Sequence, residues 1–224
     1  MGQKINPRGF RLGTIYSWTS RWFADKRRYG EILLEDVKLR EYLFLRLKNA
    51  GIAELHIERS INKMKVILHV ARPGVVIGRG GSGLEELKRF IEDFLAHHRA
   101  LRAKNVSARK TGDTGKSKLE ISVEPIKEPN LHAYLVATTI ADQLCRRIPP
   151  KRVCNQALER VMNAGARGVK VVLSGRINGA EIARTEKHTT GTIPLSTIRE
   201  EVDYASVPAL TKSGYVGVKV WICR

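Results

Sequence analysis

The stretch PGVVIGRGGSGL, residues 73–84, decides the fold of this chain. It contains five glycines and one arginine, and it lies between a strand-like segment and an amphipathic helix. Because glycine has no Cβ, a loop of this kind lets the backbone approach another molecule closely. The start of the following helix favours a phosphate group. The stretch therefore predicts a phosphate-binding loop, and the residues around it indicate which kind of molecule carries the phosphate.

Two nucleotide-binding motifs resemble parts of the sequence but fit it poorly. Residues 78–83 match G-x-G-x-x-G, yet a dinucleotide-binding fold requires a central strand before this motif and, after its helix, a parallel strand ending in an acidic residue. Here only a short apolar run precedes the motif, and the helix leads into a basic segment. Residues 111–117 approach a P-loop, but Lys110 replaces its first glycine and a strand follows instead of a helix. A nucleotide-binding enzyme is therefore only the third functional hypothesis.

The order of the elements around the loop favours a KH module. Apolar residues recur at helical spacing over 35–50, alternate over 53–58 and 64–70 as in a hairpin, and alternate again over 119–123. Gly78-Arg79-Gly80-Gly81 supplies the G-x-x-G loop with which KH modules hold about four nucleotides of a single strand. The order helix, strand, strand, helix, G-x-x-G, helix, strand is the type II KH order (α-β-β-α-α-β). A plain glycine turn in an α+β domain is the alternative.

The rest of the sequence adds an arm and a second domain. Helices are predicted over 130–148 and 151–164, and strands over 169–173, 181–188, 199–210 and 216–222. We therefore predict an α+β fold in three parts. They are a basic N-terminal arm (1–30), a type II KH domain (31–128) with a long basic loop at 97–118, and a second two-layer α+β domain (129–224).

The net charge of +18, from 40 basic and 22 acidic residues, indicates an anionic partner. Nucleic acid is the first choice and an anionic membrane the second, although the longest uncharged stretch, 129–141, is too short to span a bilayer. Residues 1–30 and 97–118 are both strongly basic, and the arm also carries aromatic residues. Such aromatics either stack on bases or pack on the protein itself. The predicted RNA-binding residues are Lys4, Arg8, Arg11, Gly78, Arg79, Gly80, Gly81, Arg109 and Lys110.

No catalytic or metal-binding arrangement stands out in the sequence. His56 and His69 alternate with the apolar residues of the hairpin, so we place them on its solvated face. The three cysteines, Cys145, Cys154 and Cys223, fit no zinc spacing and are expected to be buried free thiols in a reducing cytosol. We therefore expect a protein that is not an enzyme and that has neither a cofactor nor a metal.

Strings of residues spread over the whole chain are specific enough to indicate a family. They are MGQK through GFRLG (1–13), ARPGVVIG (71–78), SGR (174–176), GAEIARTE (179–186) and GVKVWI (217–222). They resemble the family of the third protein of the bacterial small ribosomal subunit. The resemblance implies a cytoplasmic, ribosome-bound protein in the head of the small subunit. Such a protein binds small-subunit rRNA, touches neighbouring head proteins (the tenth and fourteenth small-subunit proteins) and helps to form the channel through which mRNA enters.

The resemblance also implies an mRNA site at the start of the helix after residue 150. Bacterial relatives carry an Arg-Arg-x-x-Lys cluster there, linked to gripping and unwinding mRNA, and the matching positions are Lys151, Arg152 and Asn155. Two charges are kept and the third is lost, although Arg146 and Arg147 lie just before and could compensate. Alternatively, these charges only serve the helix ends and solubility. A free KH-type RNA-binding regulator that acts outside the ribosome is the second functional hypothesis.

Overall fold

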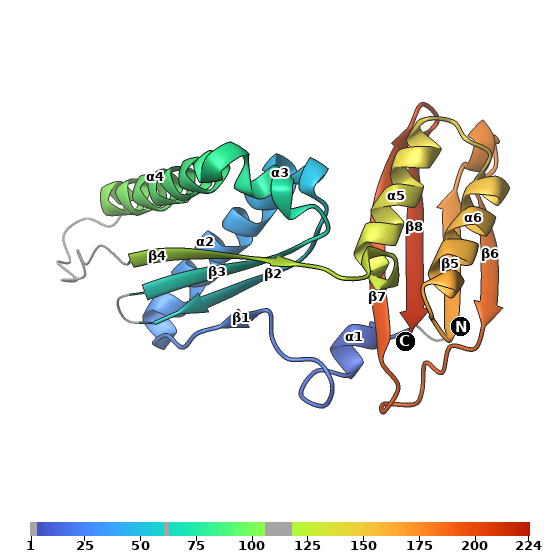
Figure 1. Ribbon diagram of the computed structural model, residues 1–224, viewed down its shortest axis with the longest axis horizontal. Coiled ribbons are helices and arrows are strands. Elements are labelled where there is room, and N and C mark those ends of the chain that lie inside the picture. The colour runs from blue at the N-terminus through green and yellow to red at the C-terminus, as the bar shows by residue number, and fades with distance from the viewer. Residues whose placement is uncertain (1–3, 61–62, 106–117) are drawn as a thin grey trace. The chain divides into compact units, whose positions relative to one another are not determined.

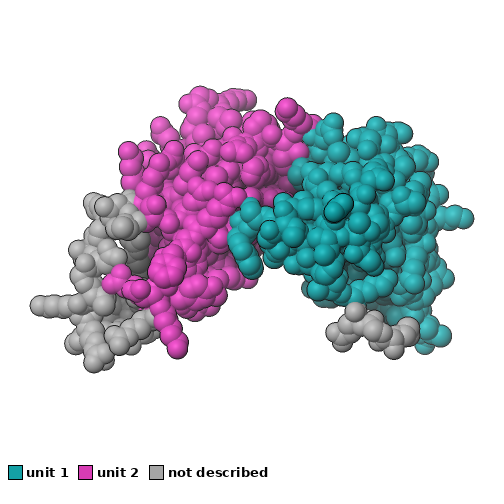
Figure 2. Space-filling model, turned by 90° about the horizontal axis from the view of Figure 1, so that it is seen from below, with its two compact units in different colours: residues 1–18, 128–224 teal, residues 19–127 magenta. Residues whose placement is uncertain are grey.

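A computed structural model describes residues 4–60, 63–105 and 118–224 of the protein. The chain forms two compact units (Figure 2): one is Thr19–Lys127, and the other joins Met1–Trp18 to Glu128–Arg224. Each unit contains a four-stranded sheet together with helices, which confirms the α+β fold class. The division differs from the three parts expected, because the described residues before Thr19 belong to the C-terminal unit.

The first unit has the type II KH order of elements (Figure 1). Its helices and strands are β1 (Ser20–Arg21), α2 (Lys26–Arg46), β2 (Ile52–Arg59), β3 (Lys63–Val70), α3 (Pro73–Ile77), α4 (Ser82–Asn105) and β4 (Lys118–Pro125), with short 3-10 helices at Lys48–Ala50 and Arg79–Gly81. The strand order is β1-β2-β3-β4. β2 and β3 are antiparallel, whereas β1 and β4 join the sheet edges in parallel.

Alternation along β3 places its apolar residues in the core, as the sequence predicts. The core residues include Met64, Val66, Leu68 and Val70 of β3, Leu39 and Leu43 of α2, and Leu87 and Ile91 of α4. His56 and His69 lie on the opposite face of the sheet, but they are half-buried rather than freely solvated. Each faces a carboxylate: His56 Nε2 is 3.0 Å from Glu54 Oε2, and His69 Nδ1 is 3.4 Å from Glu124 Oε2.

Two helices of this unit are longer than the apolar pattern predicts. α2 begins at Lys26, well before the predicted start, because the carbonyl of Asp25 already accepts the first helical hydrogen bonds. α4 continues to Asn105, so the first part of the loop expected at 97–118 is helical. In both places the additional turns are mainly polar, and a search for apolar periodicity misses them.

The second unit places two helices against one face of an antiparallel sheet (Figure 1). Its elements are α1 (Pro7–Phe10), α5 (Ala133–Cys145), α6 (Pro150–Asn163), β5 (Gly168–Gly175), β6 (Arg184–Gly191), β7 (Val202–Thr211) and β8 (Gly214–Cys223), with 3-10 helices at Pro129–Leu131 and Ile177–Gly179. The strand order is β6-β5-β8-β7. Among the described residues of both units, no helix combines the length and the apolarity that a membrane span requires.

The predicted burial of the cysteines holds for two of the three. Cys154 and Cys223 are buried, but Cys145 at the end of α5 is exposed, and its thiol donates a hydrogen bond of 3.2 Å to the carbonyl oxygen of Leu210. Burial raises the pKa of the Cys154 thiol to about 12, and the charge of Glu186 adds to the effect. Cys154 is therefore protonated and unreactive at neutral pH.

Candidate nucleic-acid interface

The glycine loop joins α3 to α4 in a conformation that only glycine adopts easily. Gly78, Gly80 and Gly81 have φ angles of +71°, +63° and +86°, all in the left-handed region. A Cβ on Gly78 would lie 3.0 Å from the backbone nitrogen of Gly83, and one on Gly83 would lie 2.6 Å from the carbonyl oxygen of Val76. Gly78 and Gly83 therefore allow α3 and α4 to pack closely. Gly80 and Gly81 allow the exposed turn to adopt left-handed φ angles.

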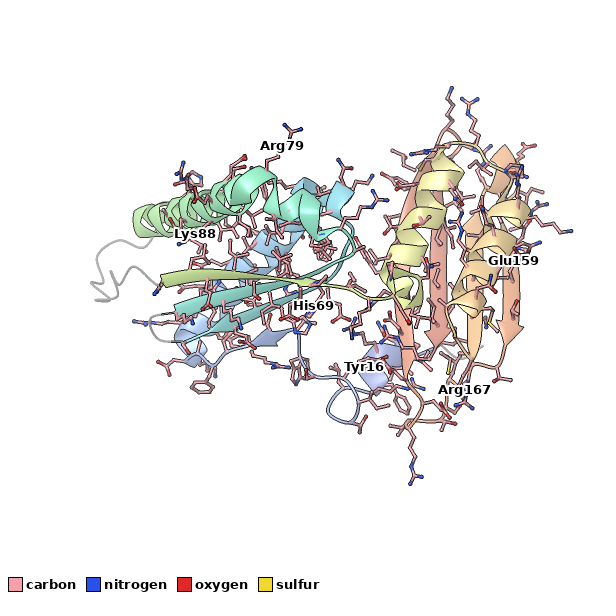
Figure 3. All side chains as sticks on the ribbon, in the orientation of Figure 1. Tyr16, His69, Arg79, Lys88, Glu159 and Arg167 are labelled. Carbon is pink, nitrogen blue, oxygen red and sulfur yellow. The ribbon has the colours of Figure 1, made fainter. Side chains whose placement is uncertain are left out.

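Arg79 stands at the exposed tip of this turn. Its side chain is directed away from α3 and α4 (Figure 3), and the Ser82 hydroxyl donates a hydrogen bond of 3.0 Å to its carbonyl oxygen. In the described part of the chain, no side chain lies over Gly80 or Gly81, since a Cβ at either position would meet no atom within 4 Å. The turn thus presents bare backbone and one guanidinium at the start of α4, which suits a phosphate of a nucleic-acid strand.

Arg11, by contrast, is not available to RNA, and its predicted role as an RNA contact is wrong. Its side chain is fully buried in the C-terminal unit. The guanidinium donates hydrogen bonds of 2.8–3.2 Å to five backbone carbonyls, which belong to Pro7, Pro194, Leu195, Thr197 and Glu200. Arg11 therefore fastens the N-terminal segment to the loop that precedes β7.

Arg8 is also engaged with the protein. Its guanidinium lies 5.3 Å from the centre of the Tyr16 ring and 4.0 Å from a carboxylate oxygen of Asp203. Asp203 in turn accepts a hydrogen bond of 2.8 Å from the amide of Ala133, at the start of α5. Burial raises the pKa of the Tyr16 phenol, and the charge of Asp203 raises it further. Of the basic residues predicted to bind RNA in this segment, only Lys4 is exposed.

Some aromatic residues near the N-terminus pack on the protein itself, and others are exposed. Trp22 packs against Tyr29, with ring centres 5.1 Å apart, and donates a hydrogen bond of 2.8 Å to the buried carboxylate of Asp36. Trp18 and Phe23 are 68% and 93% exposed. Exposed aromatic rings next to basic residues are the side chains on which bases can stack.

The corner between α5 and α6 exposes the basic residues that the family resemblance implies. Arg146, Arg147, Lys151 and Arg152 all lie on the surface. Arg147 has a φ angle of +61°, so the chain reverses at this residue before Pro150 begins α6. Lys151 and Arg152 occupy the first turn of α6, where the helix dipole disfavours positive charge and no acidic residue is present. Helix stability therefore does not explain these two charges.

One further basic residue, Arg184 of β6, joins this corner. Lys151 lines a depression together with Arg184 and Glu186, between Pro149 and Asn178, and the Arg184 guanidinium pairs with the Glu186 carboxylate at 2.8 Å. A second shallow hollow is lined by Pro149, Lys151, Arg152, Asn155, Gln156 and Glu159. Arg184 is absent from the predicted set, since it lies about thirty residues after Lys151 in the sequence and only the pairing of β6 with β5 brings it here. Asn155 is exposed in the same hollow, on the turn after Lys151.

Two of the predicted RNA contacts cannot be placed. Arg109 and Lys110 fall in residues 106–117, which lie outside the described part of the chain, as does the segment that approaches a P-loop. Among the described residues, no group of His, Cys, Asp and Glu is arranged to hold a metal ion. The candidate interface therefore consists of the glycine loop, Lys4 and the corner between α5 and α6.

These features define a nucleic-acid-binding protein with a type II KH unit and a second α+β unit. Residues 38–131 match the family model of the KH domain, and residues 140–222 match that of the ribosomal protein S3 C-terminal domain. The small ribosomal subunit protein uS3 of Finegoldia magna is 47% identical, that of Lactobacillus helveticus 46% and that of Desulforamulus reducens 43%. Each alignment covers 100% of this chain and 84%, 91% and 92% of the respective relative. The chain therefore belongs to the ribosomal protein S3 family, whose members are structural ribosomal proteins and not enzymes.

Proposed function

We propose that this protein is a structural constituent of the head of the small ribosomal subunit in the cytoplasm, where it binds rRNA and helps to form the channel through which mRNA enters. Its similarity over the full chain to small-subunit proteins of the same family supports this role. A free KH-type regulator is less well supported, because the matched relatives carry both units and are named ribosomal proteins.

The exposed corner between α5 and α6 is the observation that carries the mRNA role. Among the described residues, no ion pair neutralises Lys151 or Arg152, and both lie where the helix dipole disfavours them. Positive charge that weakens the helix on which it stands is best explained by an anionic partner. In our proposal Lys151 and Arg152 grip the mRNA backbone, assisted by Arg146, Arg147 and the neighbouring Arg184.

The rRNA contacts are assigned to the glycine loop, to Lys4 and to the basic residues Arg109 and Lys110. Gly78, Arg79, Gly80 and Gly81 supply bare backbone and one guanidinium, which fit a phosphate of a single strand. Contacts with the tenth and fourteenth small-subunit proteins require a surface of another kind. The outer side of α2 offers one, since Leu34, Val37 and Leu45 are 61%, 43% and 77% exposed there.

The mRNA role is tested by changing Lys151 and Arg152 to Gln in reconstituted small subunits. We expect elongation through a stable hairpin in the message to slow about two- to tenfold, because two phosphate contacts at the channel are lost. Elongation on an unstructured message and assembly of the particle should be unchanged. Equal slowing, or no slowing, on both messages would contradict the proposal.

The matched control is Arg160→Gln, which removes an exposed charge near the far end of the same helix. Particles with this change should read both messages at the normal rate. The free-regulator alternative is tested separately by sedimentation after a high-salt wash. A regulator would leave the small subunit, whereas a structural constituent remains with it in equal stoichiometry.

A further inference from the structure

The sheet of the C-terminal unit has a second face, which α5 and α6 do not cover. Both helices pack on the residues of β5 and β8 that alternate inward, such as Val169, Val171, Val218 and Val220. The residues between them therefore point to the opposite face of the sheet. The side chains on that face include Lys170 of β5, Thr189 and Lys187 of β6, Tyr204 and Ser206 of β7, and Lys219 and Trp221 of β8.

The strand register arranges these side chains in two neighbouring rows. In the first row, Trp221 lies opposite Lys170 on one side and opposite Tyr204 on the other. The Trp221 and Tyr204 rings have centres 5.1 Å apart, and Lys170 Nζ lies 5.4 Å from the centre of the Trp221 ring. In the second row, Lys187 and Lys219 flank Val172. The two rows are about 7 Å apart along the strands.

The charge on this face has a single sign. No acidic residue occupies either row, or the next row formed by Thr185, Ser174, Gly217 and Pro208. Lys4 and Lys187 lie close enough to Lys170 to assist burial in lowering the pKa of its ammonium group. The carboxylates of Glu200 and Glu201, beyond the end of β8, are already paired with Arg167 and Arg224 at 2.7 and 3.1 Å. Among the described residues, therefore, no acidic side chain on this face neutralises the lysines.

We propose that this open sheet face binds a segment of single-stranded RNA. A base stacks against the exposed part of the Trp221–Tyr204 pair, while Lys170, Lys187 and Lys219 contact phosphates on either side. An aromatic pair on β8 and the edge strand β7, with lysines beside it on β5, β6 and β8, is an arrangement that suits RNA, since stacking accepts any base and the charges follow the backbone. An acidic protein segment would use the lysines but would gain nothing from stacking. The face is a contact in addition to the glycine loop and the corner between α5 and α6.

The direct test is photo-crosslinking of the full chain to a short oligouridylate that contains 4-thiouridine. We expect crosslinked peptides that include Tyr204 or Trp221, besides those from the glycine loop and the α5–α6 corner. This experiment uses the unmodified protein, so that its result does not depend on the folding of a variant. Crosslinks confined to the loop and the corner would overturn the proposal.

Affinity measurements with two sets of variants separate the lysines from the aromatic ring. Changing Lys170, Lys187 and Lys219 together to Gln should lower the salt dependence of oligouridylate binding by about 2 in slope, because each phosphate contact on a single strand contributes about 0.7. The control carries the same loss of charge at the exposed Lys38, Lys88 and Lys212, and it should keep the original slope. An equal loss of slope in both variants would show that only net charge matters, and would overturn the proposal.

Trp221→Leu should weaken oligouridylate binding about tenfold without changing the salt slope, because it removes stacking but no charge. Trp221→Phe should recover part of the loss. Tighter binding of polyglutamate than of oligouridylate to this face would instead identify an acidic protein as its partner and overturn the proposal. These outcomes are independent of the role of Lys151 and Arg152 in translation, so failure here and failure of the proposed function can be told apart.

Discussion

The segment before Thr19 and the corner between α5 and α6 are both basic, yet the structure uses their charges in opposite ways. In the first, Arg11 is enclosed by backbone carbonyls and Arg8 lies against Tyr16 and Asp203. In the second, Lys151 and Arg152 stand free on the surface of α6. Both segments belong to the same compact unit, so the contrast is not one between domains.

The difference shows that the density of charge in a sequence does not tell which charges are available to a ligand. Five carbonyls satisfy the N–H groups of Arg11, and four of them come from residues 194–200, far away in the sequence. A guanidinium has five donors in a fixed plane, so that a loop of carbonyls can hold it without any acidic residue. On α6, the helix uses the carbonyls for its own hydrogen bonds, and the basic side chains extend into water.

Replacing Arg11 is the strongest way to break this contrast. Arg11→Met should destabilise the C-terminal unit by about 3–5 kcal/mol, because it leaves one buried and four half-buried carbonyls without their donor. Hydrogen exchange of the β7 and β8 amides in the full chain gives the free energy of opening for this unit alone. Arg152→Met, on the exposed corner, should change this free energy of opening by no more than about 0.5 kcal/mol. Similar losses in the two variants would show that Arg11 is not a structural anchor.

The sequence predicts those parts of the fold that depend on local patterns. Val216, Val218, Val220 and Ile222 alternate cleanly, and β8 contains all four as buried residues. The G-x-x-G stretch in its setting of helices and strands predicts the KH unit, which the match over residues 38–131 confirms. The corner residues, by contrast, follow from the family resemblance and not from a local pattern, and the structure places Arg146, Arg147, Lys151 and Arg152 at the surface.

What the sequence does not predict depends on contacts between distant segments. Neighbouring residues in the sequence predict neither the burial of Arg11 nor the position of Arg184 beside Lys151, since each requires a partner more than thirty residues away. The polar end of α4 is missed for a different reason, because its sequence has good helical propensity but no apolar periodicity.

The glycine loop extends the comparison from side chains to the backbone. Gly83→Ala should destabilise the KH unit by about 1–3 kcal/mol, because its Cβ would lie 2.6 Å from the Val76 carbonyl oxygen and force α3 and α4 apart. Gly74→Ala is the matched control in the same stretch, since Gly74 is exposed on α3 and a Cβ there meets no atom within 4 Å. Gly74→Ala should be neutral or stabilise slightly. Hydrogen exchange of the β3 amides measures both, and equal effects would show that the loop does not require close packing.

The two cysteines near the corner give an effect that is absent near neutral pH and appears only at alkaline pH. Burial raises the pKa of Cys154 to about 12, compared with about 8.5 for a thiol in an unfolded chain. The folded state therefore holds this proton more tightly than the unfolded state does. The resulting stability is fully present below about pH 8.5 and is lost as the pH rises towards 12, by at most about 1.4 kcal/mol per pH unit.

Urea denaturation of the wild type and of Cys154→Ala at a series of pH values tests this dependence. The variant is expected to be less stable near neutral pH, because the substitution leaves a small cavity, but the difference should narrow steadily between about pH 8.5 and 10.5. Cys145→Ala controls for the loss of a thiol, since Cys145 is exposed at the end of α5. A difference between wild type and Cys154→Ala that stays constant with pH would mean that the thiolate is accommodated in the core. In that case burial on the inner face of α6 would not exclude a charged group. The difference between the buried Arg11 and the exposed corner residues would then depend only on the hydrogen bonds that Arg11 donates.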